Sequence, residues 1–254
     1  MLADFLGFCE RNLDRSFAQS FQDLFALWAS GGARTGYFVE FGALNGRTFS
    51  NTYILEKLGW TGIVAEPHPD YAAVIPKART CHFSPLCVFD KSGEQIPFRV
   101  VAGRPAMSGI GDTQLDDKPE FRNNFREVQV RSITLNDLLD QYKAPAEIDF
   151  ISIDTEGSET RIMSAYDFGK RRVKSFCIEH NHIQREQLAE IMTAHGYQRV
   201  FPEISGHDDW WVLNSLVGSL GPVPLNLADH LSEVFDTGLV QRRAALARFR
   251  AGLA

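Results

Sequence analysis

Acidic, amide and imidazole side chains follow two apolar runs in the second half of the chain. Asp154 and Glu156 come after the run IDFISI, and Glu179, His180 and Asn181 come after VKSFCI. Mg²⁺ and similar hard cations bind carboxylate and amide oxygens, so Asp154, Glu179 and Asn181 form a candidate metal site. His180 titrates near neutral pH when unperturbed, which makes it the first candidate for a general base. The structural alternative is that these groups satisfy one another and nearby loop amides.

Residues 36–67 have the pattern of a strand, a glycine turn, a helix and a second strand. Gly42 and Gly46 supply turn conformations that other residues rarely adopt. One of three consecutive polar residues is expected to cap the helix: Ser50, Asn51 or Thr52. Glu66 ends the second strand about twenty residues after Gly46, the separation at which a carboxylate can accept hydrogen bonds from ribose hydroxyls. The segment therefore predicts a nucleotide-cofactor site.

Strand and helix patterns alternate through most of the chain, which predicts an α/β fold with a doubly wound, mostly parallel sheet. Strands are expected at residues 37–41, 62–66, 80–90, 127–133, 148–154 and 173–179, followed by an antiparallel edge pair at 197–205 and 208–214. Acids that end these strands, including Asp90 after the third, should meet at one rim of the sheet. Residues 102–126 show no period and are expected to form a loop or lid.

The two ends of the chain are expected to be helical. An apolar stripe at helical spacing precedes the first strand and comprises Phe17, Phe21, Leu24, Phe25 and Trp28. We therefore divide the chain into an N-terminal helical segment over residues 1–35, a cofactor-binding domain over 36–215 and a helical tail over 216–254. The terminal helices are candidates for docking or for a homodimer contact.

Composition excludes several classes of protein. A chain of 254 residues can bury one sizeable core. No apolar run approaches the roughly 20 residues of a membrane span, so we expect no membrane partner. A formal net charge of -6 argues against binding of duplex nucleic acid, which favours a basic face. The four cysteines form no CxxC pair, which favours reduced thiols and a cytoplasmic protein.

An ordered set of motifs in this chain resembles the FkbM-type family of S-adenosylmethionine-dependent methyltransferases. The motifs are FVEFGALNGRTFSNT, GIVAEPHP, ITLNDLL, IDFISIDTEGSE and IEHN, and the likeness runs roughly from residue 17 to residue 213. It implies a Rossmann-like class I methyltransferase sheet that binds S-adenosylmethionine, with Glu66 on the ribose and Asp90 near the adenine. The cofactor-binding residues expected from it are Glu40, Gly42, Ala43, Gly46, Ser50, Asn51, Thr52, Glu66, Asp90 and Asp154.

The resemblance implies an O-methyltransferase that acts on a hydroxyl of a small polar acceptor, either a sugar unit or a secondary-metabolite scaffold. His180, Asp154 and Glu179 are the candidate catalytic residues, and Mg²⁺ or another divalent cation is a possible second cofactor. An NAD-dependent oxidoreductase is an alternative, although the turn reads E-x-G-x-x-x-G and lacks the middle glycine of the dinucleotide fingerprint. A second alternative is a cofactor-binding module without catalysis that acts through its terminal helices.

Overall fold

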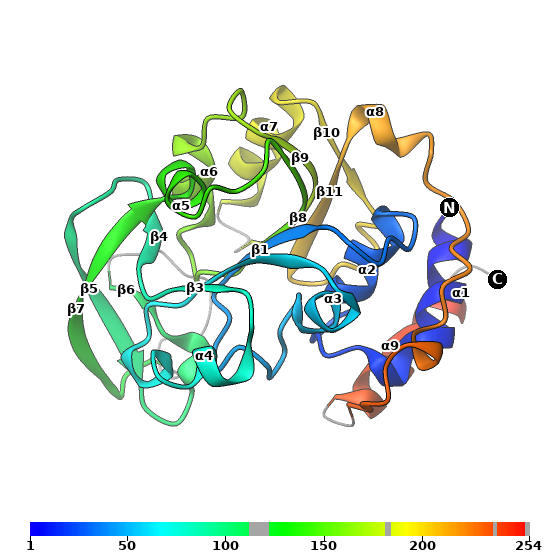
Figure 1. The fold of residues 1–254 in the computed structure, drawn as a ribbon, viewed down its shortest axis with the longest axis horizontal. Helices are drawn as coiled ribbons and strands as arrows, with labels where there is room; N and C mark the ends of the chain where they lie inside the picture. Colours follow the sequence, from blue (N-terminus) through cyan, green and yellow to red (C-terminus); the bar gives the residue numbers. More distant parts are fainter. Residues whose placement is uncertain (112–121, 181–183, 236–237, 252–254) are drawn as a thin grey trace.

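The centre of the molecule is a seven-stranded sheet in the order β3-β2-β1-β8-β9-β11-β10 (Figure 1). The computed structural model describes residues 1–111, 122–180, 184–235 and 238–251. The strands of this sheet are β1 (Tyr37–Phe41), β2 (Thr61–Ala65), β3 (His82–Ser84), β8 (Glu147–Ile153), β9 (Arg172–Glu179), β10 (Tyr197–Val200) and β11 (Asp208–Leu213). All neighbouring pairs are parallel except those that β11 makes with β9 and β10. The prediction of a mostly parallel sheet with an antiparallel edge pair is confirmed.

Helices cover both faces of this sheet. Alternate residues of β1 point to opposite sides, so Phe38 joins one buried apolar cluster and Val39 joins the other. One face packs against α5 (Leu135–Gln141), α6 (Glu159–Ala165) and α7 (Arg185–Ala194). The other packs against α2 (Gln22–Ala29) and α3 (Tyr53–Leu58), with α1 (Leu2–Asn12) and α9 (Leu239–Ala251) beyond them in the same cluster.

A second, four-stranded sheet stands beside the β3 edge of the first, with the order β4-β7-β5-β6 (Figure 1). Its strands are β4 (Cys87–Phe89), β5 (Gln95–Val101), β6 (Gly109–Ile110) and β7 (Phe125–Thr134). The single strand expected over residues 80–90 was wrong, because Pro85 separates β3 from β4 and cannot donate to a ladder. The expected loop over 102–126 was also partly wrong, since it contains β6 and the 3₁₀ turn η3 (Pro105–Met107).

The N-terminal apolar stripe is not one continuous helix. The helix α2 begins only at Gln22, and Phe21 before it has a left-handed φ of 69°. The buried carboxylate of Asp23 accepts hydrogen bonds from the backbone N–H of Phe17 at 2.7 Å and of Ala18 at 3.1 Å. This side chain therefore fixes a turn where the spacing alone predicted helix.

The remaining elements are short connections. They are η1 (Leu13–Arg15), η2 (Pro69–Tyr71), α4 (Ile75–Ala78), α8 (Asn214–Val217) and η5 (Leu227–Asp229). None of the helices among the described residues is both long and apolar enough to cross a membrane.

Candidate functional site

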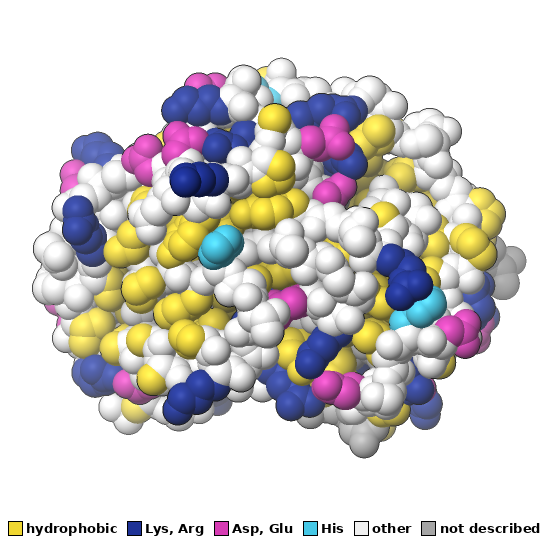
Figure 2. Space-filling model, viewed as in Figure 1, with side chains coloured by type: hydrophobic (Ala, Val, Ile, Leu, Met, Phe, Trp, Pro, Cys, Tyr) yellow, Lys and Arg dark blue, Asp and Glu magenta, His cyan; other side chains and the backbone are white. Residues whose placement is uncertain are grey.

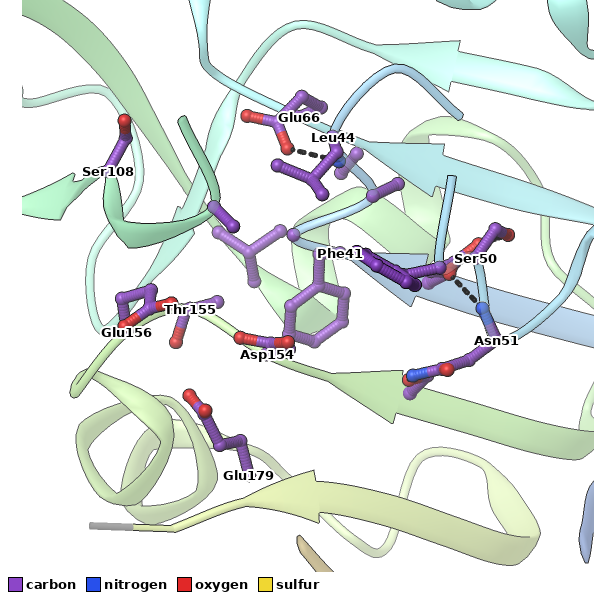
Figure 3. Close-up of a pocket in the computed structure, with 18 of the residues that line it drawn as sticks. Phe41, Leu44, Ser50, Asn51, Glu66, Ser108, Asp154, Thr155, Glu156 and Glu179 are labelled. Carbon is purple, nitrogen blue, oxygen red and sulfur yellow. Dashed lines mark hydrogen bonds between the residues drawn. The ribbon is translucent and has the colours of Figure 1, made fainter. Parts of the chain in front are cut away.

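A cavity of about 250 Å³ lies at the carboxyl ends of β1, β2, β8 and β9 (Figure 3). The central sheet contributes the turn after β1, Glu66 after β2, Asp154 to Glu156 after β8, and Glu179 at the end of β9. The small sheet and the N-terminal segment close its two sides. From them come Cys87, Val88, Phe98 and Ile110 on one side, and Gln19, Ser20 and Gln22 on the other. The expected meeting of polar groups at one rim of the sheet is confirmed for these strands.

Gly42 is required by the packing of two strand ends. Its φ is +81°, and a Cβ at this position would lie 1.6 Å from the backbone carbonyl oxygen of Asp154. The same residue donates its N–H to Ala65 at 3.2 Å. Gly46, with φ +78°, does not line the cavity, and a Cβ there would meet the Arg79 side chain at 3.2 Å. Both glycines therefore serve the packing of the turn.

Glu40 is buried and fully engaged with its own chain. Its carboxylate accepts hydrogen bonds from the Ser50 hydroxyl at 2.8 Å, the Asn51 backbone N–H at 2.6 Å and the Thr52 hydroxyl at 2.5 Å. The buried guanidinium of Arg79 lies 3.3 Å from it. Although Glu40 borders the cavity, its carboxylate is used to shape the turn, and Thr52 lies behind the lining.

Arg79 was not found by sequence reasoning. It also donates to Glu56 at 2.7 Å and to the Gly46 carbonyl at 3.1 Å, so it ties the turn to α3. It follows the short helix α4 in a segment without any recognisable motif. No pattern along the chain indicates that it enters the core.

Ser50 and Asn51 fulfil separate roles after the turn. The Ser50 hydroxyl accepts from the backbone N–H of Tyr53, the first residue of α3, at 3.1 Å, whereas Thr52, the N-cap residue, makes no capping hydrogen bond with its side chain. The Asn51 amide donates to the Ser152 hydroxyl at 2.8 Å. Its Oδ1 is buried and accepts no hydrogen bond from the described residues, although Asn51 lines the cavity. This oxygen is available to a donor on a bound ligand.

Glu66 lies on the opposite side of the cavity from the acids of β8 and β9 (Figure 3). Its carboxylate accepts from the backbone N–H of Leu44 at 2.9 Å and of His68 at 2.8 Å. Burial raises the pKa of Glu66 to about 7. Leu44 has a left-handed φ of 51°, so the turn is bent to bring its N–H to Glu66.

Three carboxylates converge at the ends of β8 and β9. Oxygens of Asp154, Glu156 and Glu179 all lie within 4.8 Å of one another. Burial, followed by repulsion from neighbouring carboxylates, raises the pKa values of Asp154 and Glu179 well above their ordinary range. Glu156 has a φ of 60° and pairs with Arg122. Such an arrangement favours a proton, a metal ion or a cationic ligand.

Asp208 extends this group of acids. It is 7% exposed, and burial raises its pKa to about 6. The Gln22 side-chain amide donates to its Oδ2 at 2.6 Å. Sequence reasoning missed Gln22, because the two residues are 186 positions apart and only the folded chain brings them together.

Besides Gly46 and Thr52, two predicted site residues among those that the structure describes do not line the cavity, His180 and Asp90. The His180 side chain is 1% exposed, and its Nε2 lies 3.8 Å from Asp209 Oδ1. The Asp90 carboxylate accepts from Arg161 at 2.7 and 3.0 Å, outside the cavity, because β4 belongs to the small sheet and turns Cys87 and Val88 toward the site instead. Asn181 lies outside the described residues.

The model of the methyltransferase FkbM domain matches residues 40–203, well over half of the chain. No curated protein sequence matches the chain. Among solved structures, a precorrin-6y C5,15-methyltransferase from Geobacter metallireducens is similar, with a TM-score of 0.40 and 12% sequence identity over 75% of this chain and 85% of that one. The family match covers the turn after β1, Glu66 and the acids of β8 and β9. The chain belongs to the FkbM methyltransferase family, for which S-adenosylmethionine is the methyl donor.

Proposed function

We propose that this protein is an O-methyltransferase that transfers the methyl group of S-adenosylmethionine to a hydroxyl of a small polar acceptor, a sugar unit or a secondary-metabolite scaffold. The observation that carries the proposal is a single cavity with Glu66 on one side and Asp154, Glu156 and Glu179 on the other. Glu66 is placed to accept hydrogen bonds from the ribose of the donor, and the three other acids are placed to accept the proton of the acceptor hydroxyl.

The lining fits S-adenosylmethionine. Glu66 would accept from the ribose hydroxyls, and the apolar side chains of Val88, Phe98 and Ile110 would cover the adenine in place of Asp90. The unpartnered Oδ1 of Asn51 would accept a hydrogen bond from the amino group of the donor. When bound, the cofactor supplies a methyl group activated by its sulfonium. Gly42 keeps the turn close against β8, so this part of the site is formed before any ligand enters.

The proton of the acceptor hydroxyl would pass to the carboxyl pair Asp154 and Glu179. The two groups are close enough to share a proton, and burial together with their mutual repulsion raises the pKa of each, which favours uptake of a proton by the pair. His180, the first candidate from sequence, stays a prediction. Because its side chain is buried beside Asp209, we expect it to act by positioning. A carboxamide at Glu179 should lower turnover far more than an alanine at His180.

A divalent cation is a further proposal at the same acids. Asp154, Glu156 and Glu179 would be its ligands. Glu156 takes the place of Asn181, which the sequence analysis paired with Asp154 and Glu179. Turnover after treatment with a chelator, with and without added Mg²⁺, tests this. Unchanged turnover would remove the metal from the mechanism.

The surface agrees with a small-molecule acceptor. Five basic residues near α6 and β9 each pair with a carboxylate: Arg161, Lys170, Arg171, Arg172 and Lys174. Basic and acidic side chains are mixed on the face shown in Figure 2. We therefore expect no nucleic-acid partner. A homodimer through the terminal helices stays a prediction that light scattering would check.

Calorimetric titration with S-adenosylmethionine, S-adenosylhomocysteine and NAD tests the proposal. We expect the first two to bind at one site per chain and NAD to fail. Binding of NAD alone would favour an oxidoreductase. Binding of the methyl donor without methyl transfer to any member of an acceptor panel would instead favour a non-catalytic module.

A further inference from the structure

The cavity is acidic along its whole length. Among the described residues that line it, none is lysine or arginine, whereas six are acidic: Glu40, Glu66, Asp154, Glu156, Glu179 and Asp208. The two at the turn side are satisfied within the protein, Glu40 by Arg79 and Glu66 by backbone amides. The remaining four lie together at the ends of β8, β9 and the adjoining β11.

These four acids carry more negative charge than the nearby cations neutralise. Glu156 pairs with Arg122, but no lysine or arginine in the described part of the chain forms an ion pair with Asp154, Glu179 or Asp208. Asp208 and Glu179 lie opposite one another on β11 and β9. Holding like charges together away from water costs stability unless a cation or several hydrogen-bond donors accompany them. The described residues supply only neutral side-chain donors to Asp208, the Gln22 amide and the Cys177 thiol.

The wall beside these acids is polar and contains no lysine or arginine among the described residues. It consists of Gln19, Ser20 and Gln22 from the segment before α2, together with His207 before β11. The buried, unpartnered Oδ1 of Asn51 adds another acceptor to the same cavity. A ligand that enters from this side meets hydrogen-bond acceptors and carboxylates, and it meets no lysine or arginine of the described residues.

We propose that the acceptor carries a protonated amine next to the hydroxyl that is methylated, as in an amino sugar or amino polyol, and that Glu179 and Asp208 bind this ammonium. The inference rests on the proposed methyl transfer. In that step the acceptor oxygen forms a bond to the methyl carbon, the methyl–sulfur bond breaks, and the hydroxyl proton passes to the Asp154–Glu179 pair. The ammonium is bound throughout and takes no part in the exchange of bonds. Phosphorylated and carboxylated acceptors are excluded by repulsion.

Binding to enzyme loaded with S-adenosylhomocysteine tests the proposal without needing the natural acceptor. Three probes of similar size differ in charge: glucosamine, glucose and glucuronate. Ligand-observed NMR at pH 7 should show glucosamine binding at least about tenfold more tightly than glucose, and glucuronate should not bind. Equal affinity for glucosamine and glucose, no binding of glucosamine, or preference for glucuronate would overturn the proposal.

Substitutions of the two proposed ammonium ligands test where in the cavity the preference for glucosamine arises. Asp208→Asn and Glu179→Gln should each reduce the preference for glucosamine by at least about threefold while the affinity for S-adenosylhomocysteine stays within about twofold. Asp140→Asn, at an exposed ion pair with Arg171, is the matched control and should change neither value. A preference that survives both cavity variants would contradict the assignment, as would loss of the preference when Mg²⁺ is added. Failure of S-adenosylhomocysteine to bind would instead contradict the proposed function.

Discussion

Two groups of carboxylates lie at the ends of neighbouring strands of this molecule, and the protein surrounds them differently. At the end of β1, Glu40 receives three hydrogen bonds and the guanidinium of Arg79. At the end of β8, Asp154 lies beside Glu179 without an ion pair to a lysine or arginine of the described residues. The first group is complete within the protein and shapes the turn. The second is incomplete, which is the condition expected of a site that binds a ligand or moves a proton.

Gly42 lies where the end of β1 packs against the end of β8, and its substitution should have the largest effect on stability. Gly42→Ala places a Cβ 1.6 Å from the Asp154 carbonyl oxygen, so the ends of β1 and β8 must separate. We expect a loss of more than about 4 kcal/mol in the free energy of unfolding, measured by urea denaturation. Gly93→Ala is the matched control, since Gly93 has a similar φ of +85° but nothing within 4 Å. Equal losses in the two variants would show that backbone strain alone matters.

Removal of the Arg79 guanidinium from beside Glu40 should lower the free energy of unfolding by nearly as much. Arg79→Met leaves Glu40 buried without its counter-charge, and we expect a loss of about 3–5 kcal/mol by urea denaturation. Arg47→Met, which removes an exposed ion pair with Glu233, should cost less than about 1 kcal/mol. A loss below 1 kcal/mol for Arg79→Met would mean that Glu40 does not need its partner.

Neutralising Glu179, in the group that lacks a cation, should have the opposite effect: stability is kept and activity is lost. Glu179→Gln removes a repulsive charge beside Asp154, so stability should be unchanged or higher. Turnover should fall by about 10²–10⁴-fold because the shared proton acceptor is lost. Methyl transfer measured with radiolabelled donor, alongside thermal unfolding, checks both. Full turnover would exclude this carboxyl pair as the base.

A change of pH should have a smaller effect, on the affinity for the methyl donor at Glu66. Burial raises the pKa of Glu66 to about 7, so the fold favours its protonated form, and this group's contribution to stability falls as pH rises from 4.5 to 7. Ribose binding requires the carboxylate, whose fraction falls from about nine-tenths at pH 8 to about one-tenth at pH 6. Donor affinity should therefore weaken by up to about tenfold over that range, as measured by calorimetry. The same pH dependence in Glu66→Gln would assign it to another group.

The sequence was sufficient to predict the parallel sheet, the turn after β1 and the acids at the strand ends. Glu66, Asp154 and Glu179 could be located because each directly follows an apolar strand pattern. Arg79 and Gln22 could not, since their partners Glu40 and Asp208 lie far away along the chain and no local period records the contact. Asp90 was misplaced because Pro85 sends the following strand into a second sheet, a topology that periodicity does not encode.

The most direct test of the account is a crystal structure with S-adenosylhomocysteine bound. We expect the ribose hydroxyls on Glu66, the adenine against Val88, Phe98 and Ile110, and the sulfur facing Asp154 and Glu179 across space for an acceptor. A ligand whose sulfur points away from Asp154 and Glu179, or one bound outside this cavity, would contradict the assignment of the two carboxylate groups.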